Sequence, residues 1–270
     1  MVDRRPIGLF DSGFGGLTVA RAVIDLLPAE DIVYIGDTGR YPYGPRPLDE
    51  VRRFARQITA KLVDEHDVKL VVVACNTAAA AGLDGLTGPS DTPVLSVIEP
   101  GVRALLRATA AGRVGVIGTV GTISSGAYQR AITGLDRSGR VELACAACPG
   151  FVEFVERGEI DSDQVYVLAE RLLAPIREAK VDSLLLGCTH YPFLARTISD
   201  VVGRDVVLVS SADETAFELR SLLTDRELQN GSESPGSHTW ISSGDIETFR
   251  TLGRRLLGPE VDTVQRWEPG

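Results

Sequence analysis

Two segments in different halves of the chain repeat one pattern. Residues 70–77 (LVVVACNT) and 184–190 (LLLGCTH) are each an apolar run that ends in a cysteine followed by a polar residue. A short apolar run bounded by small polar residues is typical of a strand buried on both faces. Cys75 and Cys188 are therefore predicted at the carboxyl ends of two strands, the edge at which open α/β sheets bind ligands.

The repetition extends upstream of both cysteines. Residues 6–13 (PIGLFDSG) open the first half, and residues 113–121 (RVGVIGTVG) hold the equivalent place in the second. Each segment is an expected strand with an internal glycine that leads into a helix. Because self-similarity of this kind indicates a duplicated architecture, we expect two pseudosymmetric α/β lobes with the site between them.

Apolar runs alternate with amphipathic stretches along the whole chain. The predicted strands are residues 7–10, 32–36, 70–74, 94–97, 114–118, 141–145, 183–186 and 206–209. The clearest predicted helices are residues 48–63, 163–179 and 215–223. This alternation implies parallel sheets with helices on both faces. Beyond them, a strand at 238–242, a helix at 245–257 and a strand at 261–267 form a C-terminal unit.

The composition is that of an ordinary globular protein. A chain of 270 residues with 44% hydrophobic and 24% charged residues can form a substantial core. The net charge of −9 argues against nucleic acid and anionic membranes as partners, since neither gains counterion release from an acidic protein. No apolar stretch has the length of a membrane span, and no signal sequence is evident, so we expect a cytoplasmic protein.

The cysteines permit more than one interpretation. Four thiols are too few for a disulfide scaffold. Cys145 and Cys148 have the spacing of a redox motif, which is weak support without an electropositive setting. A zinc site is an alternative that would recruit Cys145, Cys148, Cys188 and His190. That set leaves the matching Cys75 unexplained.

A pair of thiols on facing lobes suits the inversion of a carbon centre. Proton transfer that inverts a centre needs a base on one face and an acid on the other, because the intermediate carbanion is planar. A thiol with a pKa near 8.5 provides both forms close to neutral pH. The pattern therefore favours racemisation.

The sequence gives no support for a cofactor. Pyridoxal phosphate needs a lysine, and the chain has only Lys61, Lys69 and Lys180. The last two precede the cysteine-bearing strands and so belong to the opposite edge of each sheet. No phosphate-binding loop is present, and the glycines at 13–16 lack the last glycine of the dinucleotide fingerprint. We expect no cofactor and no metal.

Ordered motifs then point to a known family. Residues 10–18 (FDSGFGGLT), 36–44 (GDTGRYPYG), 74–78 (ACNTA) and 187–192 (GCTHYP) closely resemble the glutamate racemase family in order and spacing. The resemblance runs from about residue 6 to 223 and more loosely through the C-terminal unit. It implies a cytoplasmic, cofactor-independent enzyme that interconverts L- and D-glutamate and supplies D-glutamate for peptidoglycan and the cell wall.

The resemblance also implies a discontinuous first lobe. The C-terminal segment of this family returns to the first lobe, which gives residues 1–98 together with 210–270 as one lobe and 99–209 as the other. A homodimer is the default expectation for the assembly.

Catalytic roles carry over by motif. The resemblance implies that Cys75 acts on D-glutamate and Cys188 on L-glutamate. Asp11 would assist the first thiol, and His190 the second, by taking its proton or orienting it. Glu156 matches a position linked to the second side, although a solvated helix charge is an equally simple interpretation of this residue.

The substrate has two carboxylates and one ammonium. Helix N-termini and hydroxyl groups can hold carboxylates without arginine. The implied substrate-binding residues are Asp11, Ser12, Tyr43, Gly44, Asn76, Thr77, Thr119, Thr122, Thr189 and His190. For the threonines, ordinary helix capping would require the same residue type.

Two other functions remain open at the level of sequence. Aspartate racemase and related isomerases use the same paired cysteines. A non-catalytic module that binds zinc or another thiol ligand belongs to a different class.

Overall fold

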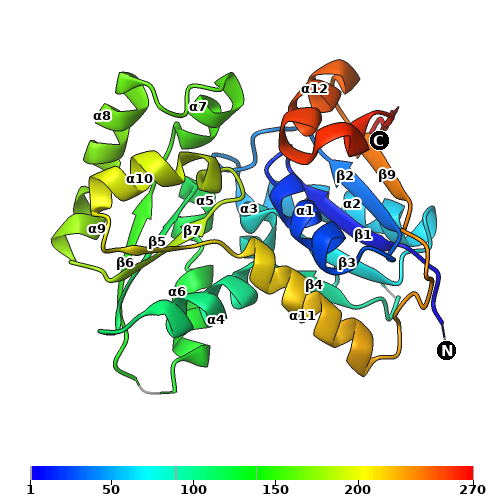
Figure 1. Ribbon diagram of the computed structural model, residues 1–270, viewed down its shortest axis with the longest axis horizontal. Coiled ribbons are helices and arrows are strands. Elements are labelled where there is room, and N and C mark those ends of the chain that lie inside the picture. The colour runs from blue at the N-terminus through cyan, green and yellow to red at the C-terminus, as the bar shows by residue number, and fades with distance from the viewer. Residues whose placement is uncertain (1, 89, 138, 270) are drawn as a thin grey trace.

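The chain forms two parallel sheets, each with helices on both faces (Figure 1). In this computed structural model, which describes residues 2–88, 90–137 and 139–269, the strands form a six-stranded sheet of order β10-β9-β2-β1-β3-β4 and a four-stranded sheet of order β6-β5-β7-β8. Every pairing between neighbouring described strands is parallel. The predicted fold class is confirmed.

The strands of the first sheet are β1 (Ile7–Asp11), β2 (Ile32–Gly36), β3 (Leu70–Val73), β4 (Val94–Ser96), β9 (His238–Ser242) and β10 (Val264–Arg266). The strands of the second sheet are β5 (Arg113–Gly118), β6 (Glu142–Ala147), β7 (Ser183–Gly187) and β8 (Val207–Val209). The order β2-β1-β3-β4 in the first sheet repeats as β6-β5-β7-β8 in the second. Each repeated cysteine therefore follows the third strand of its unit.

The helices that cover the first sheet are α1 (Leu17–Leu26), α2 (Leu48–Asp64), α3 (Asn76–Ala80), α11 (Ala212–Asp225) and α12 (Ile246–Leu257). Those of the second sheet are α4 (Ile98–Ala108), α5 (Val120–Ser124), α6 (Ala127–Leu135), α7 (Phe151–Arg157), α8 (Asp163–Leu172), α9 (Ala174–Glu178) and α10 (Ala195–Val202). Short 3₁₀ turns are η1 (Tyr191–Leu194) and η2 (Gly258–Val261).

Helix α2 illustrates why these segments fold as they do. Its buried side chains include Val51, Ala55, Ile58 and Leu62, which recur at helical spacing and form one apolar stripe. That stripe covers one face of the first sheet, and α1, α11 and α12 cover the other. Burial of each large aliphatic side chain contributes about 1.5–3 kcal/mol.

One hydrophobic cluster runs from the first sheet into the second. It contains Val73 of β3, Val102 of α4, Val116 of β5 and Leu185 of β7. The two sheets are therefore joined by a shared core as well as by the polypeptide.

The predicted elements are confirmed with local corrections. All the predicted strands are present, as is the C-terminal strand, helix and strand. The predicted helix at 163–179 is interrupted at Leu173, because Pro175 cannot donate a backbone hydrogen bond and starts a new helix instead. The last strand is shorter than predicted, because η2 takes its first residues.

Both described ends of the chain lie in the first lobe, at the right of Figure 1. The chain enters the second sheet through α4 and returns through α11, which packs against α1. The division into 1–98 plus 210–270 and 99–209 stays a prediction; residues 1, 89, 138 and 270 lie outside the described residues. In the described part of the chain, no helix has both the length and the apolar character of a membrane span.

Candidate active site

A pocket of about 610 Å³ lies where the carboxyl edges of the two sheets face each other. Most of the predicted site residues line it: Asp11, Ser12, Tyr43, Gly44, Cys75, Asn76, Thr77, Thr119, Cys188, Thr189 and His190. Thr122 and Glu156 lie outside this lining, but each forms a hydrogen bond with a residue that belongs to it. Both sulfur-bearing side chains therefore reach one pocket from different lobes.

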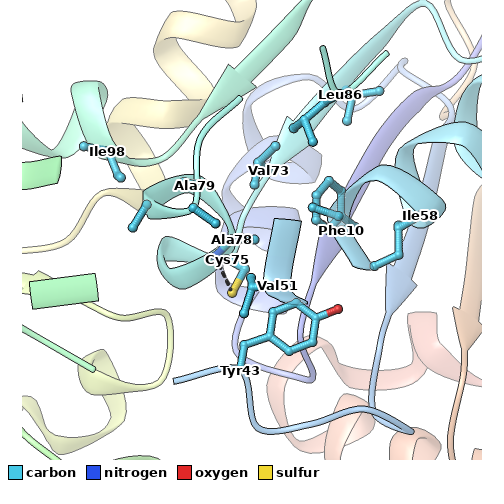
Figure 2. Close-up of a cluster of buried hydrophobic side chains, with 14 of the residues drawn as sticks. Phe10, Tyr43, Val51, Ile58, Val73, Cys75, Ala78, Ala79, Leu86 and Ile98 are labelled. Atoms are coloured by element: carbon cyan, nitrogen blue, oxygen red, sulfur yellow. Dashed lines mark hydrogen bonds between the residues drawn. The ribbon is translucent and has the colours of Figure 1, made fainter. Parts of the chain in front are cut away.

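Cys75 caps the N-terminus of α3 directly after β3. Its sulfur accepts a hydrogen bond from the backbone N–H of Ala78 at 3.5 Å and donates one to Ser12 Oγ at 3.6 Å. Figure 2 shows this sulfur at the start of the helix, with a dashed line to the backbone of Ala78. Burial, followed by the charge of Asp11, raises the pKa of the Cys75 thiol well above its ordinary value. Cys75 is thus held as a neutral thiol.

Asp11 is buried at the end of β1 and is held by backbone N–H groups. Its Oδ1 accepts a hydrogen bond from the N–H of Ser12 at 2.6 Å, and its Oδ2 accepts one from the N–H of Gly16. A Cβ on Gly16 would lie 2.6 Å from the Asp11 Cβ, so only glycine permits this approach. Oδ2 also accepts the Thr189 hydroxyl at 3.2 Å, which links the two lobes.

On the opposite side, Cys188 belongs to a chain of polar groups. Its sulfur lies 3.9 Å from Nδ1 of His190, whose Nε2 lies 3.2 Å from Oε1 of Glu156. Burial lowers the pKa of His190, but its hydrogen bonds to Cys188 and Glu156 outweigh burial and raise the pKa to about 10. An imidazolium therefore donates to Glu156 with one nitrogen and faces the Cys188 sulfur with the other.

The structure separates the two glutamates of α7. Glu156 forms the bond to His190, as its predicted position on the second side requires. Glu153, the neighbouring glutamate that competes with Glu156 for this position in the family resemblance, instead lines the pocket itself.

Three threonine hydroxyls meet at the boundary between the lobes. Thr77 Oγ1 lies 3.0 Å from Thr119 Oγ1 and 3.1 Å from Thr122 Oγ1, and the last two hydroxyls are 2.9 Å apart. Thr77 belongs to the first turn of α3, and Thr119 caps α5. Both helix starts border this place, and the three hydroxyls can donate hydrogen bonds to an anionic group here.

The loop that carries Tyr43 and Gly44 reaches across to the second lobe. The Gly44 carbonyl accepts a hydrogen bond from the N–H of Gly121 at 2.9 Å. The Tyr43 hydroxyl donates to the buried carboxylate of Asp37, which also accepts from Arg40 at 2.7 Å. No lysine or arginine is found among the described residues that line the pocket. Carboxylates of a ligand would therefore meet hydroxyls and N–H groups only.

The other two cysteines do not act together. Cys145 belongs to β6 and packs against the cluster shared by the lobes, whereas Cys148 follows that strand and lies in the core of the second lobe. Burial raises the pKa of Cys145 to about 11 and that of Cys148 to about 12. The structure therefore gives no support to the redox interpretation of the C-x-x-C spacing. Within the described residues, no group of three or more His, Cys, Asp or Glu side chains has the geometry of a metal site.

Some lining residues were not predicted: Tyr41, Pro42, Pro45, Val120, Cys148, Pro149, Gly150, Val152 and Glu153. The two at 41–42 belong to a motif quoted for the family resemblance, so a signal existed for them. The segment at 148–153 follows β6, which is the strand equivalent to β2 in the duplication. The repeat could therefore predict that this segment lies beside the pocket, but it could not predict which of its side chains line it.

Comparisons with known proteins agree on one family. The family model described as Asp/Glu/Hydantoin racemase matches residues 12–218. A glutamate racemase of Parafrankia sp. (strain EAN1pec) is 50% identical over 260 residues, which cover 96% of this chain and 93% of that protein. A glutamate racemase of Mycobacterium leprae (strain TN) is 50% identical over 261 residues, which cover 96% of this chain and 94% of that protein.

Solved structures give the same result. The glutamate racemase isoform RacE1 of Bacillus anthracis has a TM-score of 0.90 at 39% identity and covers 98% of this chain and 97% of its own. The glutamate racemase of Francisella tularensis in complex with D-glutamate has a TM-score of 0.89 at 33% identity and covers 99% of this chain and 98% of its own. An aspartate racemase of Picrophilus torridus, at 16% identity, shares the fold alone.

Proposed function

This chain belongs to the Asp/Glu/hydantoin racemase family, and on that premise we propose that it interconverts L- and D-glutamate with two thiols as acid and base. The observation that carries the proposal is that Cys75 and Cys188 line one pocket from different lobes. The near full-length identity of 50% to glutamate racemases supports glutamate as the substrate.

In the reaction from L-glutamate, the Cys188 thiolate removes the α-proton and becomes a thiol. The electron pair of the broken C–H bond stays on the α-carbon and is delocalised into the α-carboxylate. The Cys75 thiol then donates its proton to the opposite face, which forms D-glutamate and leaves a thiolate on Cys75. The reverse reaction uses the same groups in exchanged roles, so no cofactor is consumed.

The environment of Cys75 suits its role as the proton donor in this direction. Cys75 is kept neutral by burial and by Asp11, whereas Cys188 faces the imidazolium of His190. Asp11 then assists Cys75, and the pair of His190 and Glu156 assists Cys188.

Substrate binding follows from the polar groups that remain. The hydroxyls of Thr77, Thr119 and Thr122 and two helix starts receive one carboxylate. The other carboxylate meets the Ser12 hydroxyl and the backbone N–H groups of Tyr43, Gly44 and Thr189, since the hydroxyls of Tyr43 and Thr189 already donate to Asp37 and Asp11. The ammonium group faces Asp11 and the carboxamide of Asn76.

Isotope exchange tests the proposal. In deuterium oxide without added cofactor, L-glutamate should lose optical rotation while it gains one α-deuterium, as followed by polarimetry and proton NMR. Cys75→Ser and Cys188→Ser should each abolish racemisation. Full activity of either variant, or racemisation without solvent deuterium, would contradict the two-thiol scheme. A parallel assay with L-aspartate tests whether aspartate, rather than glutamate, is the substrate.

The cellular role follows from the product. D-glutamate enters peptidoglycan, so the enzyme works in the cytoplasm in support of cell wall synthesis. We further propose a homodimer, which sedimentation velocity would test directly: a single species with the mass of one chain would contradict it.

A further inference from the structure

Tyr128 of α6 contacts the chain beside both catalytic cysteines. Its hydroxyl oxygen accepts a hydrogen bond from Nδ2 of Asn76 at 2.7 Å, and Asn76 directly follows Cys75. Its ring lies against Gly187, which directly precedes Cys188: a Cβ at Gly187 would lie 3.0 Å from Cε2 of the ring. One fully buried side chain of the second lobe therefore touches the neighbours of both thiols.

The carboxamide of Asn76 is left with one unused acceptor. Asn76 is buried and lines the pocket, and its Oδ1 has no hydrogen-bond partner within the described chain. Tyr128 takes one N–H of the amide nitrogen, whereas the amide oxygen has no partner and is available to a ligand. A buried carbonyl oxygen without a partner is unfavourable, so a donor that arrives with the substrate is well matched to it.

The charge of that donor follows from the substrate. Among the groups of glutamate only the α-ammonium donates hydrogen bonds, since both carboxylates accept them. An amide turned the other way would present N–H groups to the ammonium and an oxygen to Tyr128. The direction in which the amide is held therefore decides whether this contact attracts or repels the substrate ammonium.

We propose that Tyr128 is a positioning residue that fixes the Asn76 carboxamide with its oxygen towards the substrate ammonium. This inference rests on the proposed function and adds a determinant of amino-acid recognition to it. Two parts of the side chain do separate work. The hydroxyl orients the amide, whereas the ring packs against the strand end that carries Cys188.

The hydrogen bond between Asn76 and Tyr128 can persist through the reaction. Burial raises the pKa of the Tyr128 hydroxyl, so it stays neutral throughout the working range of the enzyme. A neutral hydroxyl can continue to accept the amide N–H whichever of the two thiols carries the proton.

Tyr128→Phe removes the hydroxyl and keeps the ring. We expect the KM for glutamate to rise about tenfold, which corresponds to about 1.4 kcal/mol, with a smaller change in kcat. The matched probe is glutarate, which has both carboxylates and no ammonium. Its inhibition constant should stay within about twofold of the wild-type value, since a factor of two is well below 1 kcal/mol.

A double-mutant cycle with Asn76→Ala tests whether Tyr128 acts through the carboxamide of Asn76. Once the carboxamide is gone, Tyr128→Phe should raise the glutamate KM no further. Equal losses for glutamate and glutarate, an unchanged KM, or additive losses in the double variant would each overturn the inference. Thermal unfolding of each variant verifies that the fold persists.

Calorimetric titration keeps this inference separable from the proposed function. If the wild-type protein binds glutamate but does not racemise it, the proposed reaction fails. The ratio of glutamate to glutarate affinities in wild type and Tyr128→Phe still decides the role of Tyr128.

Discussion

The two thiols have the same place in the repeat but different neighbours. Cys75 is bonded to Ser12 and to a helix N–H beside the carboxylate of Asp11. Cys188 faces His190, which Glu156 holds from behind. The repeated backbone thus places the two thiols in different chemical environments.

His190→Asn is expected to reduce catalysis strongly. Loss of the imidazolium removes the group that faces Cys188, and we expect kcat/KM to fall about 10²-fold. The two enantiomers have equal free energies, so kcat/KM must fall equally in both directions. Circular dichroism assays from pure L- and pure D-glutamate measure this. Glu156→Gln, which leaves the imidazole in place, should give a smaller loss; an equal or larger loss would assign the main role to the carboxylate.

The same histidine links stability to pH. Its pKa is raised from 6.5 in the unfolded chain to about 10 in the folded protein, so the protonated form stabilises the fold. This contribution is fully present below about pH 6.5 and is lost as the pH rises towards 10. The difference in Tm between wild type and His190→Asn should therefore shrink over that interval. A difference that is independent of pH would show that His190 is neutral in the folded state.

At the scale of elements, the C-terminal helix supports the glycine turn below the pocket. Phe249 of α12 lies with its ring centroid 5.4 Å from that of Phe14 and 6.2 Å from that of Tyr34. The Tyr34 hydroxyl donates to the carbonyl of Gly13 at 3.1 Å. The turn that holds Asp11 in place is therefore packed from beneath by a segment more than 200 residues away in sequence.

Phe249→Ala tests that support. Removal of a fully buried aromatic ring should lower the free energy of unfolding by about 3–5 kcal/mol, as measured by urea denaturation. Phe217→Ala is the matched control, because that ring on α11 is 46% exposed and its loss should cost at most about 0.5 kcal/mol. Similar losses for the two variants would mean that α12 is not packed as described.

The elements themselves were the most predictable part of the molecule. Apolar runs such as those before Cys75 and Cys188 identify buried strands, because the two-sided burial of a parallel sheet leaves little room for polar residues. The interruption at Leu173 was harder to foresee, since Pro175 is compatible with either a helix start or a kink. Tyr128 gave no signal at all, because its partner Asn76 belongs to the other lobe, and Gly187 comes near its ring only once the second lobe has folded.

At the scale of the whole molecule, the lobes share both polar and apolar contacts. Asp11 bonds to Thr189, and Gly44 bonds to Gly121, across the pocket. The repeat predicted that two lobes face each other, but a single sequence contains no measure of how closely. The extent of this contact could only be obtained from the structure.

Shared packing predicts cooperative unfolding of the two lobes. Because one hydrophobic cluster includes strands of both sheets, loss of either sheet exposes apolar surface of the other. Scanning calorimetry should give a single transition with equal calorimetric and van't Hoff enthalpies. Two resolved transitions would indicate that the lobes unfold independently.

The order of strands in the first sheet has a consequence for biosynthesis. Strand β2 is neighboured by β9, so its outer edge stays open until His238–Ser242 have been synthesised. The strands of the second sheet, in contrast, have all been synthesised once the ribosome reaches Val209. A nascent chain can therefore complete its second lobe before the first has received its last strands, and the enzyme becomes competent only after β9 and β10 have been synthesised.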